Sequence, residues 1–197
     1  MIKIGLFIIP DLSLKNFISK LKSLVRKKFG HQTYINHLPH CSLYVFKTNK
    51  KNLNILKDKR LIISKYKKKY LTDKTDIFYN DPITTKNTYI IKIKKNIFLS
   101  NLQYLILREF KKYALKKNSI YKKKLMNKNF KSFGYPFIRS NWKPHFTIAS
   151  ISPKNNQSDF IKEFKKIKIK KKQYLNKVYV YQIKKNNHKF LCKIDIR

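Results

Sequence analysis

The sequence is short of acidic residues, glycine and cysteine, and each shortage excludes a kind of site. Of its 197 residues, 9 are Asp or Glu, 3 are Gly and 2 are Cys. So few carboxylates disfavour catalysis by paired acidic side chains, and three scattered glycines form no loop that wraps phosphates. Cys41 and Cys192 do not make a disulfide framework in a chain of this length, which favours a reduced, cytoplasmic protein.

Long apolar runs are also missing. No stretch of about 18 apolar residues exists, so we expect no membrane-spanning helix. Residues 1–10 hold a short apolar segment without a small-residue cleavage site, which is typical of a first strand and not of a signal peptide. With 42% hydrophobic residues the chain can build a core. Its length predicts a single domain over residues 1–197, which we expect to be a monomer.

Basic residues are in great excess. Lys and Arg number 48 and give a formal net charge of +39, which would steer polyanions such as RNA towards the protein at low salt. The excess has a second explanation, because lysines far outnumber the five arginines and Ile and Asn are abundant, as an AT-rich coding bias would produce. Both explanations stay open, so the charge alone does not identify a nucleic-acid partner.

Two short stretches of the chain are copies of one another. Residues 39–43 are Pro-His-Cys-Ser-Leu, and residues 144–148 are Pro-His-Phe-Thr-Ile. We call them the first motif and the second motif. Each consists of Pro, His, a large apolar or sulfur side chain, a hydroxyl and an aliphatic residue, and each leads into an apolar run. This composition predicts that both motifs begin β-strands.

The spacing within each motif has a physical meaning. Side chains alternate between the two faces of a strand, so residues i and i+2 share a face. His40 therefore points the same way as Ser42, and His145 the same way as Thr147, while the residues between them point into the core. Two such strands facing each other would bring two imidazoles and two hydroxyls to one small anion.

The histidines allow two other interpretations, a third His-x-Ser/Thr match and a metal site. His31-Gln32-Thr33 is a third match to His-x-Ser/Thr, but it follows a helix stop and continues into a loop-like run, and it lacks the Pro that precedes the histidine of both motifs. A metal site built from His31, His37 and His40 has no Cys pair and no His-Glu spacing to support it. We therefore expect no metal and no cofactor.

The paired motifs resemble those of the two-histidine (2H) phosphoesterase superfamily, which includes the 2′-5′ RNA ligase-like proteins and RNA cyclic phosphodiesterases. The resemblance implies an α+β class and a bilobal, duplicated fold, in which two antiparallel sheets form a central cleft with helices on the outside. It implies that His40 and His145 are catalytic and that Ser42 and Thr147 bind the phosphate. The first motif departs slightly, because Ser42 stands where Thr is commoner.

The residue types fit the chemistry that the resemblance implies. Imidazole moves protons near neutral pH, and a phosphodiester reaction needs one base and one acid. We expect a metal-independent phosphodiesterase for cyclic 2′,3′- or 2′-5′-linked nucleotides, with RNA ends or a nucleotide cyclic phosphate as partner. Two alternatives stay open: a non-catalytic basic RNA-binding module, and a cyclic phosphodiesterase of a small metabolite. Base stacking by Tyr135, Phe137 or Trp142 is less favoured than a place in the core.

Hydrophobic periodicity predicts the remaining elements. Strands are expected at residues 3–9, 40–46, 61–70, 88–93, 178–183 and 190–196 and at the second motif. Helices are expected from Asp11 or Ser13 to Gly30, at residues 53–56, at residues 98–116 and after Ser158. Residues 31–39 and 117–141 are expected to be loops, and residues 73–86 to be rich in turns. The first helix should bury one stripe: Leu14, Phe17, Ile18, Leu21, Leu24 and Val25.

Overall fold

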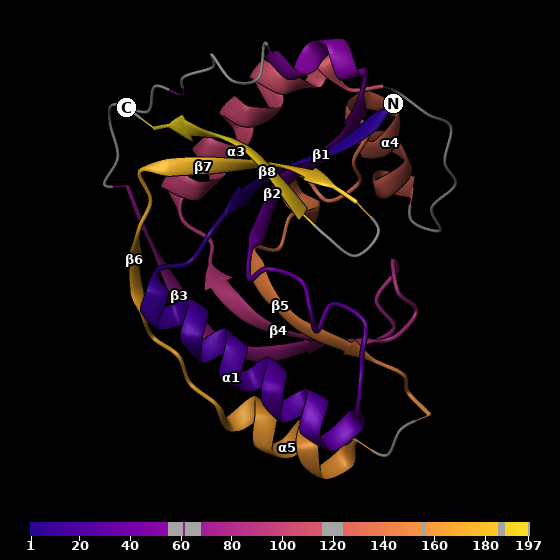
Figure 1. Cartoon of the computed structure of the whole chain (residues 1–197), viewed down its shortest axis with the longest axis vertical. Helices are drawn as coiled ribbons and strands as arrows, with labels where there is room; N and C mark the ends of the chain where they lie inside the picture. Colours follow the sequence, from indigo (N-terminus) through magenta and orange to yellow (C-terminus); the bar gives the residue numbers. More distant parts are fainter. Residues whose placement is uncertain (55–60, 62–67, 116–123, 155–156, 185–187, 197) are drawn as a thin grey trace.

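The protein has an α+β fold with two four-stranded antiparallel sheets (Figure 1). The computed structural model describes residues 1–54, 61, 68–115, 124–154, 157–184 and 188–196. The first sheet has the order β2-β1-β7-β8, with β1 at Ile2–Ile8, β2 at Cys41–Thr48, β7 at Lys177–Ile183 and β8 at His188–Asp195. The second has the order β5-β4-β3-β6, with β3 at Lys69–Phe78, β4 at Asn87–Lys94, β5 at His145–Ile151 and β6 at Lys172–Tyr174. The predicted class is confirmed.

Four α-helices lie on the outside of the sheets in the part of the chain that the structure describes (Figure 1). They are α1 at Leu12–Phe29, α3 at Ile97–Phe110, α4 at Lys124–Phe133 and α5 at Ser158–Lys166, and the short 3₁₀ helices are η1 at Lys50–Asn52, η2 at Lys111–Tyr113 and η3 at Arg139–Asn141. The Asp11 carboxylate caps α1 by accepting from the Leu14 amide at 2.8 Å, as the sequence predicted. No described helix is long and apolar enough to cross a membrane.

The sheets reveal a duplication that extends well beyond the two motifs. In one half the chain runs β1-α1-β2, and in the other it runs β4-α3-β5. In both halves the strand after the helix pairs antiparallel with the strand before it. Both motif strands, β2 and β5, therefore end up at the edge of their sheets.

The helices of the two halves are exchanged. Helix α1 packs against β5, the motif strand of the second half, and α3 packs against β2, the motif strand of the first. Figure 1 shows α1 below the second sheet and α3 above the first. Both sheets consequently share one hydrophobic core, and neither motif strand is supported by its own half alone.

The predicted stripe of α1 is largely confirmed, with one error. Leu14, Ile18, Leu21 and Val25 are buried, whereas Leu24 is 48% exposed. The helix turns by about 100° for each residue, so Leu24 lies too far from the centre of the stripe to reach the core. Lys22, by contrast, is buried, and its ammonium donates to two backbone carbonyls.

Most of the predicted strands and helices are confirmed, and three regions need correction. Residues 73–86 were expected to be turns, but β3 continues to Phe78. Residues 117–141 were expected to be a loop, but they contain α4 and η3. The helix expected at residues 98–116 ends at Phe110 and continues as η2. The expected helix at residues 53–56 and strand at residues 61–70 fall largely outside the described residues.

Candidate active site

Each motif lies where its edge strand begins. His40 directly precedes β2, and His145 is the first residue of β5. All four expected site residues, His40, Ser42, His145 and Thr147, are partly exposed. The residues that alternate with them are in the core: Cys41, Leu43, Phe146 and Ile148 are at most 1% exposed. The predicted alternation of faces is thus confirmed in both motifs.

The two motif strands lie close together at the centre of the molecule (Figure 1). Trp142, three residues before His145, donates from its indole Nε1 to the Ser42 carbonyl oxygen at 2.9 Å. The Cys41 thiol is close enough to interact with the backbone of His145: burial raises the pKa of this thiol to about 12, and a hydrogen bond from that backbone opposes the rise. Trp142 is 4% exposed, so it serves the core and not base stacking.

Both motif histidines have the same hydrogen bond. The Nδ1 atom of His40 lies 2.7 Å from the Leu38 carbonyl oxygen, and Nδ1 of His145 lies 2.6 Å from the Lys143 carbonyl oxygen. A carbonyl oxygen only accepts, so Nδ1 must carry a proton in each ring. In a neutral imidazole this leaves Nε2 unprotonated. Each ring therefore presents a bare Nε2, which can take a proton from a substrate group or, once protonated, return it.

The hydroxyls of the motifs are available as donors. Among the described residues, neither Ser42 Oγ nor Thr147 Oγ1 has a hydrogen-bond partner, although the Ser42 backbone carbonyl is bonded to Trp142. Each hydroxyl lies on the same face of its strand as the histidine two residues before it. An anion between the strands could accept from both.

The surroundings of His40 are aromatic. The ring of Phe7 stacks on that of His40 with centroids 4.0 Å apart, and the His188 ring lies 5.1 Å away. The His37 ring in turn lies 4.9 Å from His188. Burial lowers the pKa of His40 to about 3; the hydrogen bond to the Leu38 carbonyl opposes this decrease, and the charges of His188, His37 and Lys22 add to it. His40 is thus neutral at pH 7.

Gly5 makes the stacking on His40 possible. A Cβ atom at this position would lie 2.1 Å from Cζ of Phe7, which is far inside van der Waals contact. The absence of a side chain lets the Phe7 ring lie flat over β1, where it contacts His40. Phe7 is 1% exposed, so its ring has little room to move aside.

The surroundings of His145 are more strongly charged. Its ring meets that of Phe78 edge to face at 5.0 Å, and the ammonium of Lys143 lies 5.7 Å from the centre of the same Phe78 ring. Burial lowers the pKa of His145, but the bond to the Lys143 carbonyl and the carboxylate of Asp81 oppose the decrease. A carboxylate therefore favours the protonated form of His145, whereas the charged groups that shift the pKa of His40 are basic.

The loop before each motif holds one residue in the left-handed region. Tyr34 has φ +69° and Arg139 has φ +53°, and each stands six residues before its motif histidine. Such a conformation costs about 1–2 kcal/mol for a residue other than glycine. The same strained position in both halves extends the duplication back from the motifs, although Tyr and Arg show nothing of it in the sequence.

A buried polar side chain from a helix stabilises each of these loops. Lys22 of α1 donates from Nζ to the carbonyl oxygens of Tyr34 at 2.8 Å and His37 at 2.7 Å, and burial lowers its pKa to about 8. Gln103 of α3 accepts from the Arg139 amide at 3.0 Å and donates to the Leu43 carbonyl at 3.2 Å. Both side chains are buried, so each helix fixes the loop that positions a histidine.

The rejected histidine match lies outside both motif strands, although the Thr33 carbonyl accepts from the Ser150 amide of β5 at 2.9 Å. His31 is exposed and lies in the loop after α1, where its Nε2 is 3.1 Å from Nδ2 of Asn36. The Thr33 hydroxyl accepts from Lys86 at 3.1 Å. His37 does approach His40, but it does so together with His188 and not His31. In the described residues, no group of three or more His, Cys, Asp or Glu side chains is arranged to hold a metal ion.

Several residues around the motifs were not foreseen from the sequence. Phe7, Phe78 and His188 come from strands whose pairing brings them to the histidines, and no local pattern announces that pairing. The Lys143 ammonium lies over the ring of Phe78, and the Arg139 guanidinium lies over that of Phe133.

Three solved structures share this fold over nearly the whole chain. TT0787 of Thermus thermophilus has a TM-score of 0.63 at 13% identity, covering 98% of this chain and 97% of that one. E. coli LigT, in complex with NADP+, has 0.52 at 10% identity, covering 99% and 97%. A protein described as a phosphoesterase has 0.50 at 8% identity, covering 99% and 98%. At such identities the likeness establishes the fold, and the fold implied by the motifs is confirmed. No family model and no curated protein matches the sequence.

Proposed function

We propose that this chain is a two-histidine phosphoesterase that opens 2′,3′-cyclic phosphates at the ends of RNA. The observation that carries the proposal is the repeated geometry of the motifs. In each, a histidine donates from Nδ1 to the carbonyl two residues before it, and a hydroxyl follows two residues later; within the described part of the chain, neither Nε2 nor the hydroxyl has a hydrogen-bond partner. The likeness of the whole chain to LigT and to a phosphoesterase supports it.

Each of the four residues has a part in the reaction. One Nε2 takes the proton of an attacking water, and the other, as imidazolium, gives a proton to the ribose oxygen that leaves phosphorus. Ser42 and Thr147 donate hydrogen bonds to the non-bridging phosphoryl oxygens. These bonds strengthen as negative charge builds on those oxygens in the transition state. Two imidazoles supply both proton transfers, so the proposed reaction is independent of metal.

The surroundings of the histidines suggest which is the base. We assign His40 as the general base because it lies among His37, His188 and Lys22, which all disfavour a second proton on its ring. His145 is assigned as the general acid because Asp81 favours its protonated form. A bound phosphate would favour that form further, since opposite charges attract at short range.

The chain's charge supports RNA as the proposed substrate, although it does not identify RNA by itself. A net charge of +39 raises the local concentration of a polyanion and its rate of encounter. This attraction weakens with salt, so turnover of a cyclic-phosphate-ended oligonucleotide should fall more steeply with salt than turnover of a mononucleotide. The reaction needs no cofactor, and a cytoplasmic monomer remains the proposed state.

The test is turnover of an RNA oligonucleotide ending in a 2′,3′-cyclic phosphate, in EDTA. Wild type is compared with His40→Ala, His145→Ala and His31→Ala, the last being the matched exposed histidine. We expect the first two changes to lower kcat by about 10²–10⁴-fold and the third to leave it unchanged. Absence of wild-type turnover with tight, salt-sensitive RNA binding would favour a binding module instead. Turnover of mononucleotide cyclic phosphates alone would favour a small-metabolite substrate.

A further inference from the structure

Lys92 is the cross-strand neighbour of His145. The two residues are partners in the antiparallel pairing of β4 with β5, and Ile90, two residues earlier on β4, is the partner of Thr147. Directly opposed residues of an antiparallel pair share a face, with Cβ atoms about 4.5–5.5 Å apart. The Lys92 side chain therefore projects from the same face of the sheet as the imidazole and hydroxyl of the second motif.

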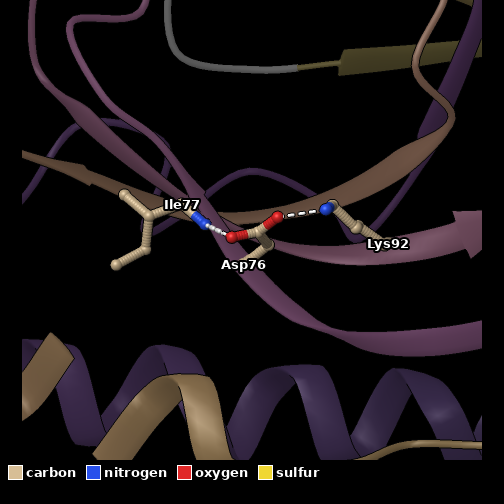
Figure 2. A network of polar contacts seen from close by, with 3 residues as sticks. All are labelled: Asp76, Ile77 and Lys92. Atoms are coloured by element: carbon tan, nitrogen blue, oxygen red, sulfur yellow. Dashed lines mark hydrogen bonds and ion pairs between the residues drawn. The ribbon is translucent and has the colours of Figure 1, made fainter. Parts of the chain in front are cut away.

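Asp76 holds the Lys92 ammonium in place. Figure 2 shows one carboxylate oxygen of Asp76 in an ion pair with Lys92 Nζ and the other accepting from the Ile77 amide at 2.8 Å. Burial would raise the pKa of Asp76, but these two hydrogen bonds and the charge of Lys92 keep it below its usual value. Asp76 therefore stays ionised at neutral pH and keeps its hold on Lys92.

This pairing is exceptional in a chain with so few carboxylates. Among the described residues, two other lysines form ion pairs with a carboxylate: Lys162 with Asp159 at 3.8 Å, and Lys177 with Asp195 at 3.9 Å. Both of those pairs are more exposed than Lys92 and Asp76, whose side chains are 39% and 27% exposed. Exposed ion pairs contribute little to stability. The residues next to Lys92 therefore explain its fixed position better than a gain in stability does.

We propose that Lys92 is a catalytic residue that binds a non-bridging oxygen of the substrate phosphate beside His145, and that Asp76 positions it. The inference rests on the proposed function and adds a fixed cation to it. An ammonium has three N–H donors, and Asp76 uses one of them, so two remain for the phosphate. The second half of the site then supplies a hydroxyl and a cation to the anion, whereas the first half supplies a hydroxyl among aromatic rings.

The experiment compares Lys92→Met with Lys177→Met, on the same cyclic-phosphate-ended RNA in EDTA. Each change removes one lysine from a cross-strand ion pair, but Lys177 lies at the start of β7 in the other sheet. A hydrogen bond from a charged group is worth enough to predict a roughly 10- to 100-fold loss of kcat/KM in Lys92→Met. Lys177→Met should stay within about twofold of wild type, because exposed pairs contribute little.

Two readouts separate phosphate binding from a structural role. Affinity for adenosine 2′-phosphate, measured by calorimetry, should fall in Lys92→Met while the thermal midpoint changes no more than in Lys177→Met. Lys92→Arg should restore part of the loss in both kcat/KM and affinity. Wild-type affinity and turnover in Lys92→Met would overturn the inference and leave the histidine mechanism intact. No turnover by wild type would instead remove the proposed function.

A double change tests the part assigned to Asp76. Asp76→Asn should lower kcat/KM less than Lys92→Met does. The new side-chain amide oxygen still accepts a hydrogen bond from Lys92, but it holds the ammonium less firmly than a carboxylate does. In the Lys92→Met background, Asp76→Asn should have no further effect if Asp76 acts through Lys92. Equal losses in both backgrounds, or a shift of the pH profile by Asp76→Asn alone, would overturn that role and indicate a direct effect on His145.

Discussion

The two halves of the molecule share a frame and differ in what surrounds their histidines. Both place the motif on an edge strand, both bind the histidine Nδ1 to the carbonyl two residues before, and both hold a left-handed residue six positions earlier. Both histidines contact a phenylalanine ring, but the charged groups near His40 are basic, whereas the carboxylate of Asp81 lies near His145. The duplication thus explains the position of the histidines, and the divergence of their neighbours is the basis for proposing opposite proton-transfer roles for two identical side chains.

The supports of the two halves differ as well. Lys22 holds the first loop through an ammonium and two carbonyls, and Gln103 holds the second through a neutral amide. The packing of α1 against β5 and of α3 against β2 also couples each half to the motif strand of the other. Neither half is therefore expected to form its site alone.

Among changes to the features that both halves share, loss of a motif hydroxyl should have the largest effect on kcat. Ser42→Ala and Thr147→Ala should each lower kcat by about 10²-fold, because each removes one donor to the developing charge. Ser42→Thr and Thr147→Ser exchange the two motifs' hydroxyl types and should stay within a few-fold of wild type. Thr33→Ala, in the rejected match, is the control. A loss from one hydroxyl change without the other would show that the halves are not equivalent.

A smaller effect should be confined to the first half. Gly5→Ala places a methyl group against the Phe7 ring and should shift the stacked His40, lowering kcat by about 10-fold, as small misplacements of catalytic groups do. The ring resonances of His40 should move by NMR while those of His145 stay in place. Unchanged kcat and unchanged His40 resonances would show that the Phe7 contact does not position the base.

The smallest expected effect is on the stability of the protein in acid. It concerns His188, whose ring lies next to that of His40 in the first half. Burial, and then His37, Lys3 and Lys22, lower the pKa of His188 to about 4, so below about pH 6.5 the unfolded chain binds the proton first. The free energy of unfolding should therefore fall as pH decreases from about 6.5 to about 4, by an amount that solvent screening of this half-exposed group reduces. His188→Gln should flatten that slope in urea titrations, and His31→Gln should not. Parallel slopes for wild type and His188→Gln would contradict this account.

Alternation and helical spacing were enough to predict most of the strands and helices, whereas their arrangement in two sheets was implied by the resemblance of the motifs. The first helix, β4, β5 and the two last strands had regular apolar patterns, and these were confirmed. Strand β3 was missed because two of its buried positions are threonines and its pairing shifts register between Thr72 and Thr75. The Thr72 hydroxyl donates to the Ile169 carbonyl at 2.6 Å, a tertiary bond that no alternation of apolar residues signals.

The candidate site was predictable where its residues are neighbours in sequence. His40 and Ser42, and His145 and Thr147, follow from a two-residue period that fixes a shared face. Lys92 and Phe7 were missed because they reach the histidines through strand pairing and stacking, which depend on register.

The most direct test of the unequal halves compares two leaving groups. Wild type, His40→Ala and His145→Ala are assayed on the cyclic-phosphate-ended RNA and on a nucleoside p-nitrophenyl phosphodiester, whose p-nitrophenolate leaves without being protonated. His40→Ala should lower kcat on both substrates by about 10²-fold or more, because both need a base. His145→Ala should lose as much on the RNA but less than about 10-fold on the p-nitrophenyl ester, because only the RNA needs its acid. Equal losses of His145→Ala on both substrates would contradict the assignment of base and acid.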